Sequence, residues 1–212
     1  MELIRTGEAA RRLGVSDRQV RHLVARGELD APRRGIVSVA SLEAHVARRG
    51  AVRARVWEPR TAWAAIELLT GGAAGWLGSS QRSRLRRSLD RLDVDSVVSR
   101  LRNRADVRTY RFEPPHRDAV ADAIVVVREG DAALDGYVDE RALQQVVSAE
   151  QLVRRPVGNL TARVLDDAVG QDFVEVVAEQ GPVLAGVDLA GSTDQEERAL
   201  GRRIVSEALA AL

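Results

Sequence analysis

The stretch from Thr6 to Gly27 constrains the fold more than any other part of the chain, because its sequence is typical of two short helices joined by a tight turn. Thr6 and Ser16 are placed to cap the two helices with their side-chain oxygens. Gly14 lies at the bend and Gly27 at the end of the second helix, where the backbone favours a residue that tolerates positive φ. Apolar residues at spacings of three and four form the expected core of this helix-turn-helix: Ala9, Ala10, Leu13, Val15, Val20, Leu23 and Val24.

The segment after Gly27 adds a predicted wing and a third helix. A turn at residues 33–35 precedes the β-like run at residues 36–39, so we expect a small hairpin with two arginines at its tip. Ser41 is expected to open the next helix, with Leu42 and Val46 facing inward. Together these elements form a compact unit of about fifty residues.

Three more helices are expected after residues 51–56, which are interpreted as a linker or a short strand. The first places Trp63, Ile66 and Leu69 on one face and stops at two glycines, the second is capped by Ser80, and the third is opened by Asp95. The helix that follows Ser80 is rich in arginine and buries a leucine stripe. This part of the chain therefore reads as a helical segment.

Beyond residue 106 the apolar period changes, which indicates a mixture of strands and helices. We expect, in order, a strand at 107–112, an ambiguous apolar run at 119–127, a helix capped by Asp139, a hairpin of 152–157 with 160–165 around Gly158-Asn159, and two final helices, the last capped by Thr193. The predicted fold class is α+β and helix-rich. The predicted segments are 1–52, 53–106 and 107–212.

The net charge of +1 conceals two oppositely charged halves. Residues 1–112 carry 23 arginines and 12 acidic residues, whereas residues 113–212 carry 9 arginines and 19 acidic residues. This division indicates a nucleic-acid surface joined to a different partner surface. The absence of cysteine excludes disulfides and thiolate metal sites. No apolar run approaches the roughly 20 residues that span a bilayer, and the first residues do not resemble a signal peptide, so we expect a cytoplasmic protein with no membrane partner.

The outward face of the second helix carries residue types that read DNA. Arg18 and Gln19 are suited to bidentate bonds with guanine and adenine, each worth about 1–3 kcal/mol of discrimination. Arg21 and His22 are expected to reach phosphates, and Asp17 is expected to cap the helix or to accept from a cytosine amine. The predicted contacts to double-stranded DNA are Ser16, Arg18, Gln19, Arg21 and His22 of the helix, and Arg33 and Arg34 of the wing.

Two other patterns bear on function. The arginine-rich run at residues 82–91 either extends the DNA contact or is a solvated face balanced by nearby aspartates. Gly78-Ser79 followed by Asp93 and Asp95 is similar to the pattern that holds metal ions in nucleotidyltransferases, but here the acids follow a helical pattern instead of a strand.

No other residue group has the spacing of an active site. The three histidines, His22, His45 and His116, lie far apart in the sequence, and the acidic residues at 188 and 194–197 look like helix caps and a solvated face. We therefore expect no catalytic residue, no metal and no cofactor, and hence no enzyme.

Helix, turn, helix, wing and helix within fifty residues, with the run GEAARRLGVSDRQVRHLVARGEL, resemble the winged helix-turn-helix of the MerR and excisionase families. Over residues 57–205 the pieces WLGSSQRSRL, GNLTARVL and VLAGVDLAGSTDQEERALGRRIV resemble actinobacterial regulators encoded beside nucleotidyltransferase-like toxins, the AbiE-like (type IV) antitoxin group. That resemblance implies a protein that binds its own promoter and contributes to neutralising a toxin. It assigns no catalytic residue.

The sequence thus predicts a DNA-binding transcriptional regulator, of the antitoxin autorepressor type, whose acidic rear domain binds a toxin protein or forms a homodimer. One alternative is a MerR-like regulator that senses a small molecule, which requires a concave apolar pocket with a few convergent polar groups. Another is an excisionase-like architectural factor that bends DNA.

Overall fold

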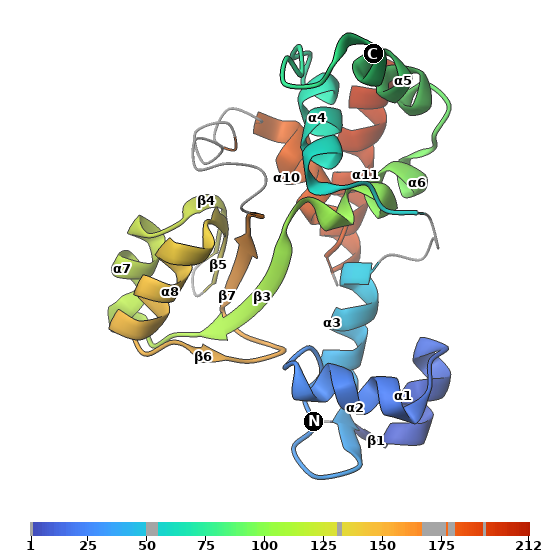
Figure 1. Cartoon of the computed structure of the whole chain (residues 1–212). Coiled ribbons are helices and arrows are strands. Elements are labelled where there is room, and N and C mark those ends of the chain that lie inside the picture. Colours follow the sequence, from blue (N-terminus) through green and yellow to red (C-terminus); the bar gives the residue numbers. More distant parts are fainter. Residues whose placement is uncertain (1, 50–54, 131–132, 167–176, 178–180, 193) are drawn as a thin grey trace.

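The protein is described by a computed structural model that covers residues 2–49, 55–130, 133–166, 177, 181–192 and 194–212. Within these residues it contains ten α-helices and two β-sheets, so the predicted helix-rich α+β class is confirmed. Figure 1 shows an N-terminal unit at one end of the molecule, a helical body at the other end and a sheet beside that body. None of the described helices is long and apolar enough to cross a membrane.

The N-terminal unit contains the two short helices that the sequence predicts. Its elements are β1 (Leu3–Arg5), α1 (Thr6–Leu13), α2 (Asp17–Ala25), β2 (Ile36–Ser38) and α3 (Val39–Arg49). The Ser16 hydroxyl accepts a hydrogen bond from the Gln19 N–H at 3.3 Å, which confirms the predicted cap of α2. Gly14 and Gly27 both have positive φ, as expected. Thr6 was wrongly assigned as a cap: β1 runs directly into α1, so Arg5 takes the cap position and Thr6 is already helical.

The predicted wing hairpin is present in reduced form. The regular strand partner of β2 is β1, which pairs antiparallel with it from Leu3 opposite Ser38 to Arg5 opposite Ile36. The chain that precedes β2 contributes an isolated bridge between Arg33 and Ile36, and the Asp30 carbonyl accepts from the Ser38 N–H at 2.9 Å. A tight turn is present at residues 33–36, called here the tip turn, because the Ile36 N–H donates to the Arg33 carbonyl at 3.0 Å. In α3, Leu42 is buried as expected, but Val46 is 45% exposed and does not face the core.

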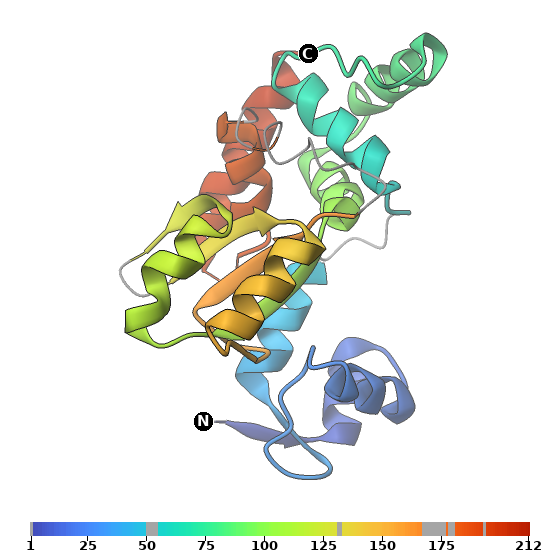
Figure 2. The same ribbon diagram turned by 60° about the vertical axis from the view of Figure 1, so that its left-hand side comes forward.

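The helical body consists of α4 (Pro59–Leu69), α5 (Ser79–Leu89), α6 (Val94–Leu101), α10 (Gly181–Leu189) and α11 (Gln195–Ala210). These helices share one buried core although α6 and α10 are separated by the whole sheet region of the chain. Trp63, Ile66 and Leu69 are buried in this core, as predicted. Figures 1 and 2 show α10 and α11 packed alongside the earlier helices.

Several helix boundaries in the body differ from prediction by one or two residues. Gly78, not Ser80, is the N-cap of α5, and the Gln81 side chain accepts from its N–H at 3.2 Å. Asp93, not Asp95, caps α6 by accepting from the Ser96 N–H at 2.7 Å. Asp194 caps α11, while the predicted cap Thr193 lies outside the described residues. Leu200 of α11 is exposed.

The larger sheet has the strand order β4-β5-β7-β3-β6. Its strands are β3 (Asp106–Arg111), β4 (Val125–Glu129), β5 (Leu134–Val138), β6 (Val153–Arg154) and β7 (Leu160–Val164). The β5–β7 pair is parallel and the other pairs are antiparallel. The expected hairpin of residues 152–157 with 160–165 is therefore wrong, because β3 lies between β6 and β7 and pairs with both.

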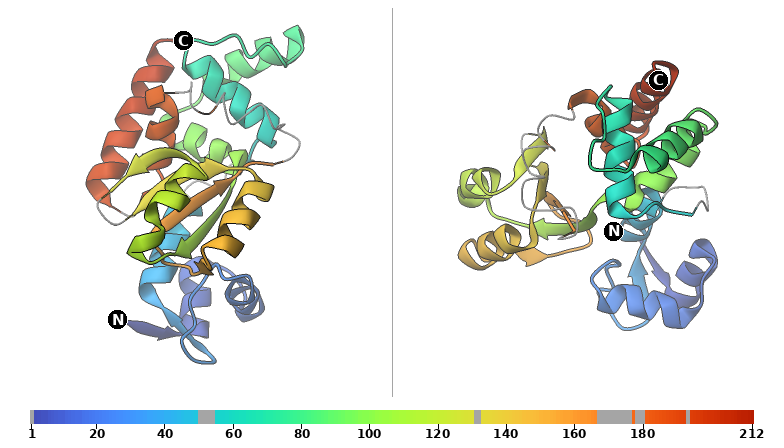
Figure 3. Two further views of the ribbon diagram at one scale, coloured as in Figure 1. Left: turned by 90° about the vertical axis from the view of Figure 1, so that its left-hand side faces the viewer. Right: turned by 45° about the horizontal axis from the view of Figure 1, so that its top comes forward.

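Helices α7 (Arg117–Asp122) and α8 (Glu140–Ala149) cover one face of this sheet (Figure 3). The Asp139 side chain caps α8 by accepting from the Ala142 N–H at 2.7 Å, as predicted. The ambiguous run at 119–127 is divided between the end of α7 and the start of β4. The opposite face of the sheet is turned towards the helical body, and Tyr137 of β5 belongs to the core of that body.

Candidate functional site

The predicted DNA-reading residues of α2 all lie on the surface. Ser16, Arg18, Gln19, Arg21 and His22 are exposed, whereas Val20 and Leu23 are buried between the helices. The alternation follows from the 3.6-residue period of the helix. The structure thus brings these polar side chains together on one outward face of a nine-residue helix, about 13 Å long.

The arginines predicted to contact DNA have no acidic partner among the described residues. Within the described residues no ion pair involves Arg18, Arg33 or Arg34, whereas Arg11, Arg12 and Arg26 pair with glutamates of their own unit. Arg21 donates only to a backbone carbonyl, that of Asp17 at 3.4 Å. An uncompensated guanidinium keeps its attraction for phosphate, since no neighbouring carboxylate offsets its charge.

The orientation of α2 leaves its N-terminal end accessible. Its C-terminal end faces the sheet, because a Cβ on Gly27 would lie 3.8 Å from the Arg154 Nε of β6. The tip turn, with the exposed Arg33 and Arg34, lies at the end of the molecule away from the helical body (Figures 1 and 2). The predicted helix and tip residues therefore lie on the same exposed unit.

A second candidate site is a cavity of about 320 Å³ between the sheet and the helical body. Its apolar walls include Val98, Val107 and Val127, and its polar lining includes Thr109, Thr161 and Ser192. Ala44 of α3 also lines it, so the cavity touches the N-terminal unit. It shares no residue with the predicted DNA contacts.

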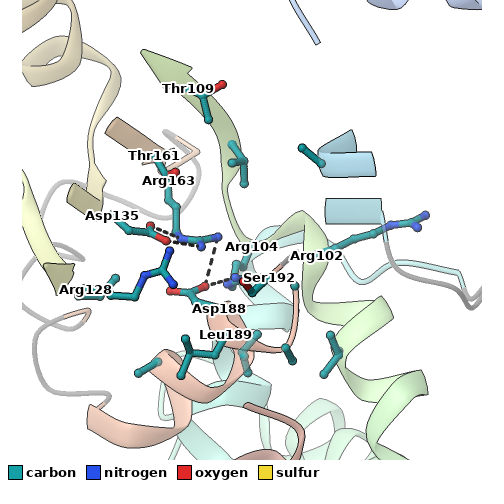
Figure 4. Close-up of a pocket in the computed structure, with 18 of the residues that line it drawn as sticks. Arg102, Arg104, Thr109, Arg128, Asp135, Thr161, Arg163, Asp188, Leu189 and Ser192 are labelled. Atoms are coloured by element: carbon teal, nitrogen blue, oxygen red, sulfur yellow. Dashed lines mark hydrogen bonds and ion pairs between the residues drawn. The ribbon is translucent and has the colours of Figure 1, made fainter. Parts of the chain in front are cut away.

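Charged side chains buried beside this cavity form one connected network (Figure 4). The Arg163 guanidinium of β7 binds Asp135 of β5 in a bidentate pair at 2.8 and 2.9 Å, and lies 3.3 Å from the Asp188 Oδ1 of α10. Arg104 of the 3₁₀ helix η1 (Arg102–Arg104) also pairs with Asp188 Oδ1 and donates to the Tyr137 hydroxyl at 2.8 Å. That hydroxyl donates to the same carboxylate oxygen at 3.0 Å.

The network holds two positive and two negative charges on buried side chains. Burial raises the pKa of Tyr137 above its usual value, although the two arginines oppose this effect. Burial disfavours the charged form of Arg163, yet Asp188 and Asp135 keep its pKa above the usual range. All described partners of Asp188 contact Oδ1, and Asp188 Oδ2 is buried with no hydrogen-bond partner among the described residues. An unsatisfied buried carboxylate oxygen is rare in folded proteins.

The sequence interpretation missed this network and assigned Asp188 to a helix cap. The structure places Asp188 inside α10, where it is buried. A signal was present, because Asp135, Arg163 and Asp188 each interrupt an otherwise apolar strand or helix. Charged residues in such positions are seldom fully buried unless they are paired.

The nucleotidyltransferase-like aspartates lie in a different setting from a metal site. Asp93 caps α6, and Asp95 forms an exposed pair with Arg202 of α11, with one contact at 2.9 Å. His116 pairs with Glu150 at 2.5 Å and His45 lies 3.6 Å from Glu28. Among the described side chains, no group of three or more His, Cys, Asp or Glu is arranged to hold a metal ion.

Comparisons with known proteins give no relative for this chain: no family model, no curated protein and no solved structure matches it significantly.

Proposed function

We propose that the chain is a sequence-specific DNA-binding transcriptional regulator, with residues 1–49 acting as a winged helix-turn-helix. The observation that supports this proposal is the exposed polar face of α2, capped by Ser16 and bearing Arg18, which forms no ion pair with any described residue. Placed in the major groove, α2 presents Arg18 and Gln19 to base edges. The tip turn adds Arg33 and Arg34 beside the groove, at the backbone or in the minor groove.

The division of roles between α2 and the tip turn can be tested with two substitutions. Arg18→Ala should relax base preference at one operator position, at a cost of about 1–3 kcal/mol. Arg34→Ala should weaken binding to all DNA sequences alike. It should also reduce the slope of the logarithm of affinity against the logarithm of salt concentration by about 1. The measurement is selection from a randomised duplex library followed by titration at several salt concentrations. Arg203→Ala, an exposed arginine of α11, is the control. Equal effects of the first two substitutions would contradict the assignment.

We also propose that the regulator is an antitoxin-type autorepressor whose rear part binds a toxin protein. The excess of acidic residues over residues 113–212 supports a partner surface that repels DNA. Copurification of the tagged chain from its native host, followed by mass spectrometry, tests this proposal. A stoichiometric partner encoded next to the regulator is the expected result. Recovery of the chain alone, with an unrelated neighbouring gene, would contradict it.

A second function, sensing of a small molecule, is favoured by the interior cavity. Its volume lies within the range of small-molecule sites, and its apolar walls and convergent polar groups are those that a sensor requires. Because Ala44 lines the cavity, a ligand there would contact α3 and so affect the placement of the N-terminal unit. A thermal-shift screen with small amines, amino acids and organic acids tests this function. A ligand that raises the melting temperature and changes DNA affinity supports it. A screen in which no ligand changes either property contradicts it.

A further inference from the structure

Helix α5 carries a concentration of positive charge that the proposed functions do not use. Five arginines fall between residues 82 and 91, with Asp90 as the single acidic residue in that run. Leu85 and Leu89 are buried against α4 and the rest of the body, which fixes the orientation of the helix. Arg84 and Arg87 of α5, and Arg91 in the turn directly after the helix, follow at spacings of three and four and are all exposed. We call these three residues the α5 stripe.

The charge of the α5 stripe is not compensated by any ion pair among the described residues. No ion pair of the described residues involves any arginine between 82 and 91. Arginines three or four positions apart on a helix repel one another, by roughly 0.2–0.5 kcal/mol per pair. The nearby aspartates are used elsewhere, because Asp93 caps α6 and Asp95 binds Arg202. A solvated face with balanced charges therefore does not describe this helix.

The position of α5 separates it from the proposed operator contacts. Figures 1, 2 and 3 all show α5 near the end of the molecule that is opposite to α1, α2 and the tip turn. DNA that contacts both α2 and the tip turn lies across the N-terminal end. A duplex segment is stiff over its persistence length of about 150 base pairs, so the same short segment does not return to α5.

We propose that the α5 stripe binds the phosphate backbone of a second duplex, so that one protein molecule bridges two segments of DNA. Duplex DNA carries one charge per about 1.7 Å of its axis, and guanidinium groups bind phosphate with two hydrogen bonds. Three exposed guanidiniums, two on α5 and one in the turn directly after it, match such a row of charges. The contact is with phosphates alone and carries no base preference. The phosphate contact itself does not depend on α2, whereas the bridging of two duplexes rests on the proposed binding of the first duplex by the N-terminal unit.

The test compares three triple variants of the full chain with the wild type. R84Q/R87Q/R91Q removes the stripe and keeps the helix-favouring character and most of the stem of each side chain. R141Q/R155Q/R203Q removes the same number of exposed arginines elsewhere and is the matched control. R18Q/R21Q/R34Q removes the proposed contacts of the N-terminal unit. Circular dichroism confirms that each variant is folded.

The readout is capture of a second, fluorescent duplex by protein already held on a duplex that is fixed to beads. The wild type and the control should capture the second duplex, and the stripe variant should bind the first duplex but capture at least tenfold less of the second. The salt slope for a random-sequence duplex should fall by about 3 in the stripe variant. The variant of the N-terminal unit should keep a stripe-dependent, salt-sensitive affinity even if it loses all sequence preference.

Three results would overturn the proposal. Capture by the stripe variant at the wild-type level would assign bridging to another surface or to an oligomer. Stripe-dependent affinity for one duplex without any capture of a second would show a single extended contact. Stripe-dependent binding of poly-glutamate, with no stripe effect on duplex, would assign α5 to an acidic protein. Loss of sequence preference in R18Q/R21Q/R34Q bears only on the proposed role of α2.

Discussion

Asp188 shows how a single buried residue can join two parts of a protein. Its Oδ1 receives Arg104 of η1, Arg163 of β7 and Tyr137 of β5, so one carboxylate connects the sheet to the helical body. Burial of these charges is costly, and their mutual attraction offsets the cost only while the set is complete. Removing one member leaves the others buried without compensation.

Asp188→Ala is therefore expected to destabilise the fold by about 3–5 kcal/mol, because two arginines lose a buried partner. The matched change is Asp95→Ala, which breaks an Arg–Asp pair whose side chains are 46% and 47% exposed and which should cost about 1 kcal/mol or less. Urea unfolding monitored by tryptophan fluorescence measures both. Similar costs for the two variants would show that burial does not set the energy of these pairs.

The Tyr137 hydroxyl gives the network a dependence on pH. The ordinary pKa of tyrosine is 10.0, and burial raises it in the folded state. Below that value both states keep the proton and the stability is complete. Above it the unfolded chain ionises first, so the free energy of unfolding falls as pH rises, by up to about 1.4 kcal/mol per pH unit.

Tyr137→Phe should be less stable than wild type at neutral pH by about 1–3 kcal/mol, because the Arg104 Nε loses its acceptor. The difference in the free energy of unfolding between the two proteins should shrink from about pH 9 to about pH 11, since the variant has no hydroxyl to ionise. Urea unfolding across that range is the measurement. A difference that stays constant with pH would rule out the assigned role of the hydroxyl.

At the scale of elements, the two N-terminal helices begin in different ways. The Ser16 side chain caps α2, whereas α1 follows β1 directly and takes no side-chain hydrogen bond at its start. Ser16→Ala should therefore destabilise the N-terminal unit by about 1 kcal/mol and weaken the proposed binding of DNA with it. Thr6→Ala should change little. Hydrogen exchange of the α2 amides measures the difference, and equal protection in both variants would contradict it.

Elements that depend on neighbouring residues were predictable from the sequence. Ser16 and Asp139 predict the starts of their helices because a capping side chain bonds an N–H only three residues away. Gly14 predicts its turn because the backbone there needs positive φ. The strand at β3 follows from its alternating pattern. Local physical chemistry is sufficient for these features.

Strand partners were not predictable, because pairing is decided by contacts far apart in the sequence. β1 is only three residues long and has no turn linking it to β2, so nothing local identifies Ser38 as the partner of Leu3. The Gly158-Asn159 pair suggests a hairpin, yet β3 pairs with both flanking strands. The Asn159 side chain instead exchanges two hydrogen bonds of 2.9 Å with the backbone of Phe112.

At the scale of the whole molecule, the helical body is built from two segments that lie far apart in the sequence. Helices α4 to α6 share their core with α10 and α11, in which Leu184 and Val205 are buried. Deletion of residues 181–212 should therefore expose the core around Trp63 and unfold the body. The N-terminal core, built within residues 4–42, should remain.

Tryptophan fluorescence and binding of a hydrophobic dye measure the loss of the body, and amide spectra of residues 3–38 report the N-terminal unit. A deletion of residues 211–212 alone, which follow the end of α11, is the control. Unfolding of both parts in the longer deletion would show that the N-terminal unit depends on the body.

The separation in sequence between Arg104 and its partner Asp188, 84 positions, has a consequence for synthesis on the ribosome. Translation delivers the N-terminal unit complete, since its core needs no later residue. Helices α4 to α6, in contrast, leave the exit tunnel with their apolar faces uncovered, and these faces are buried only after α10 and α11 have been synthesised. During that interval the nascent chain presents a finished N-terminal unit joined to an unfinished body, and this is the stage at which chaperones have most to protect.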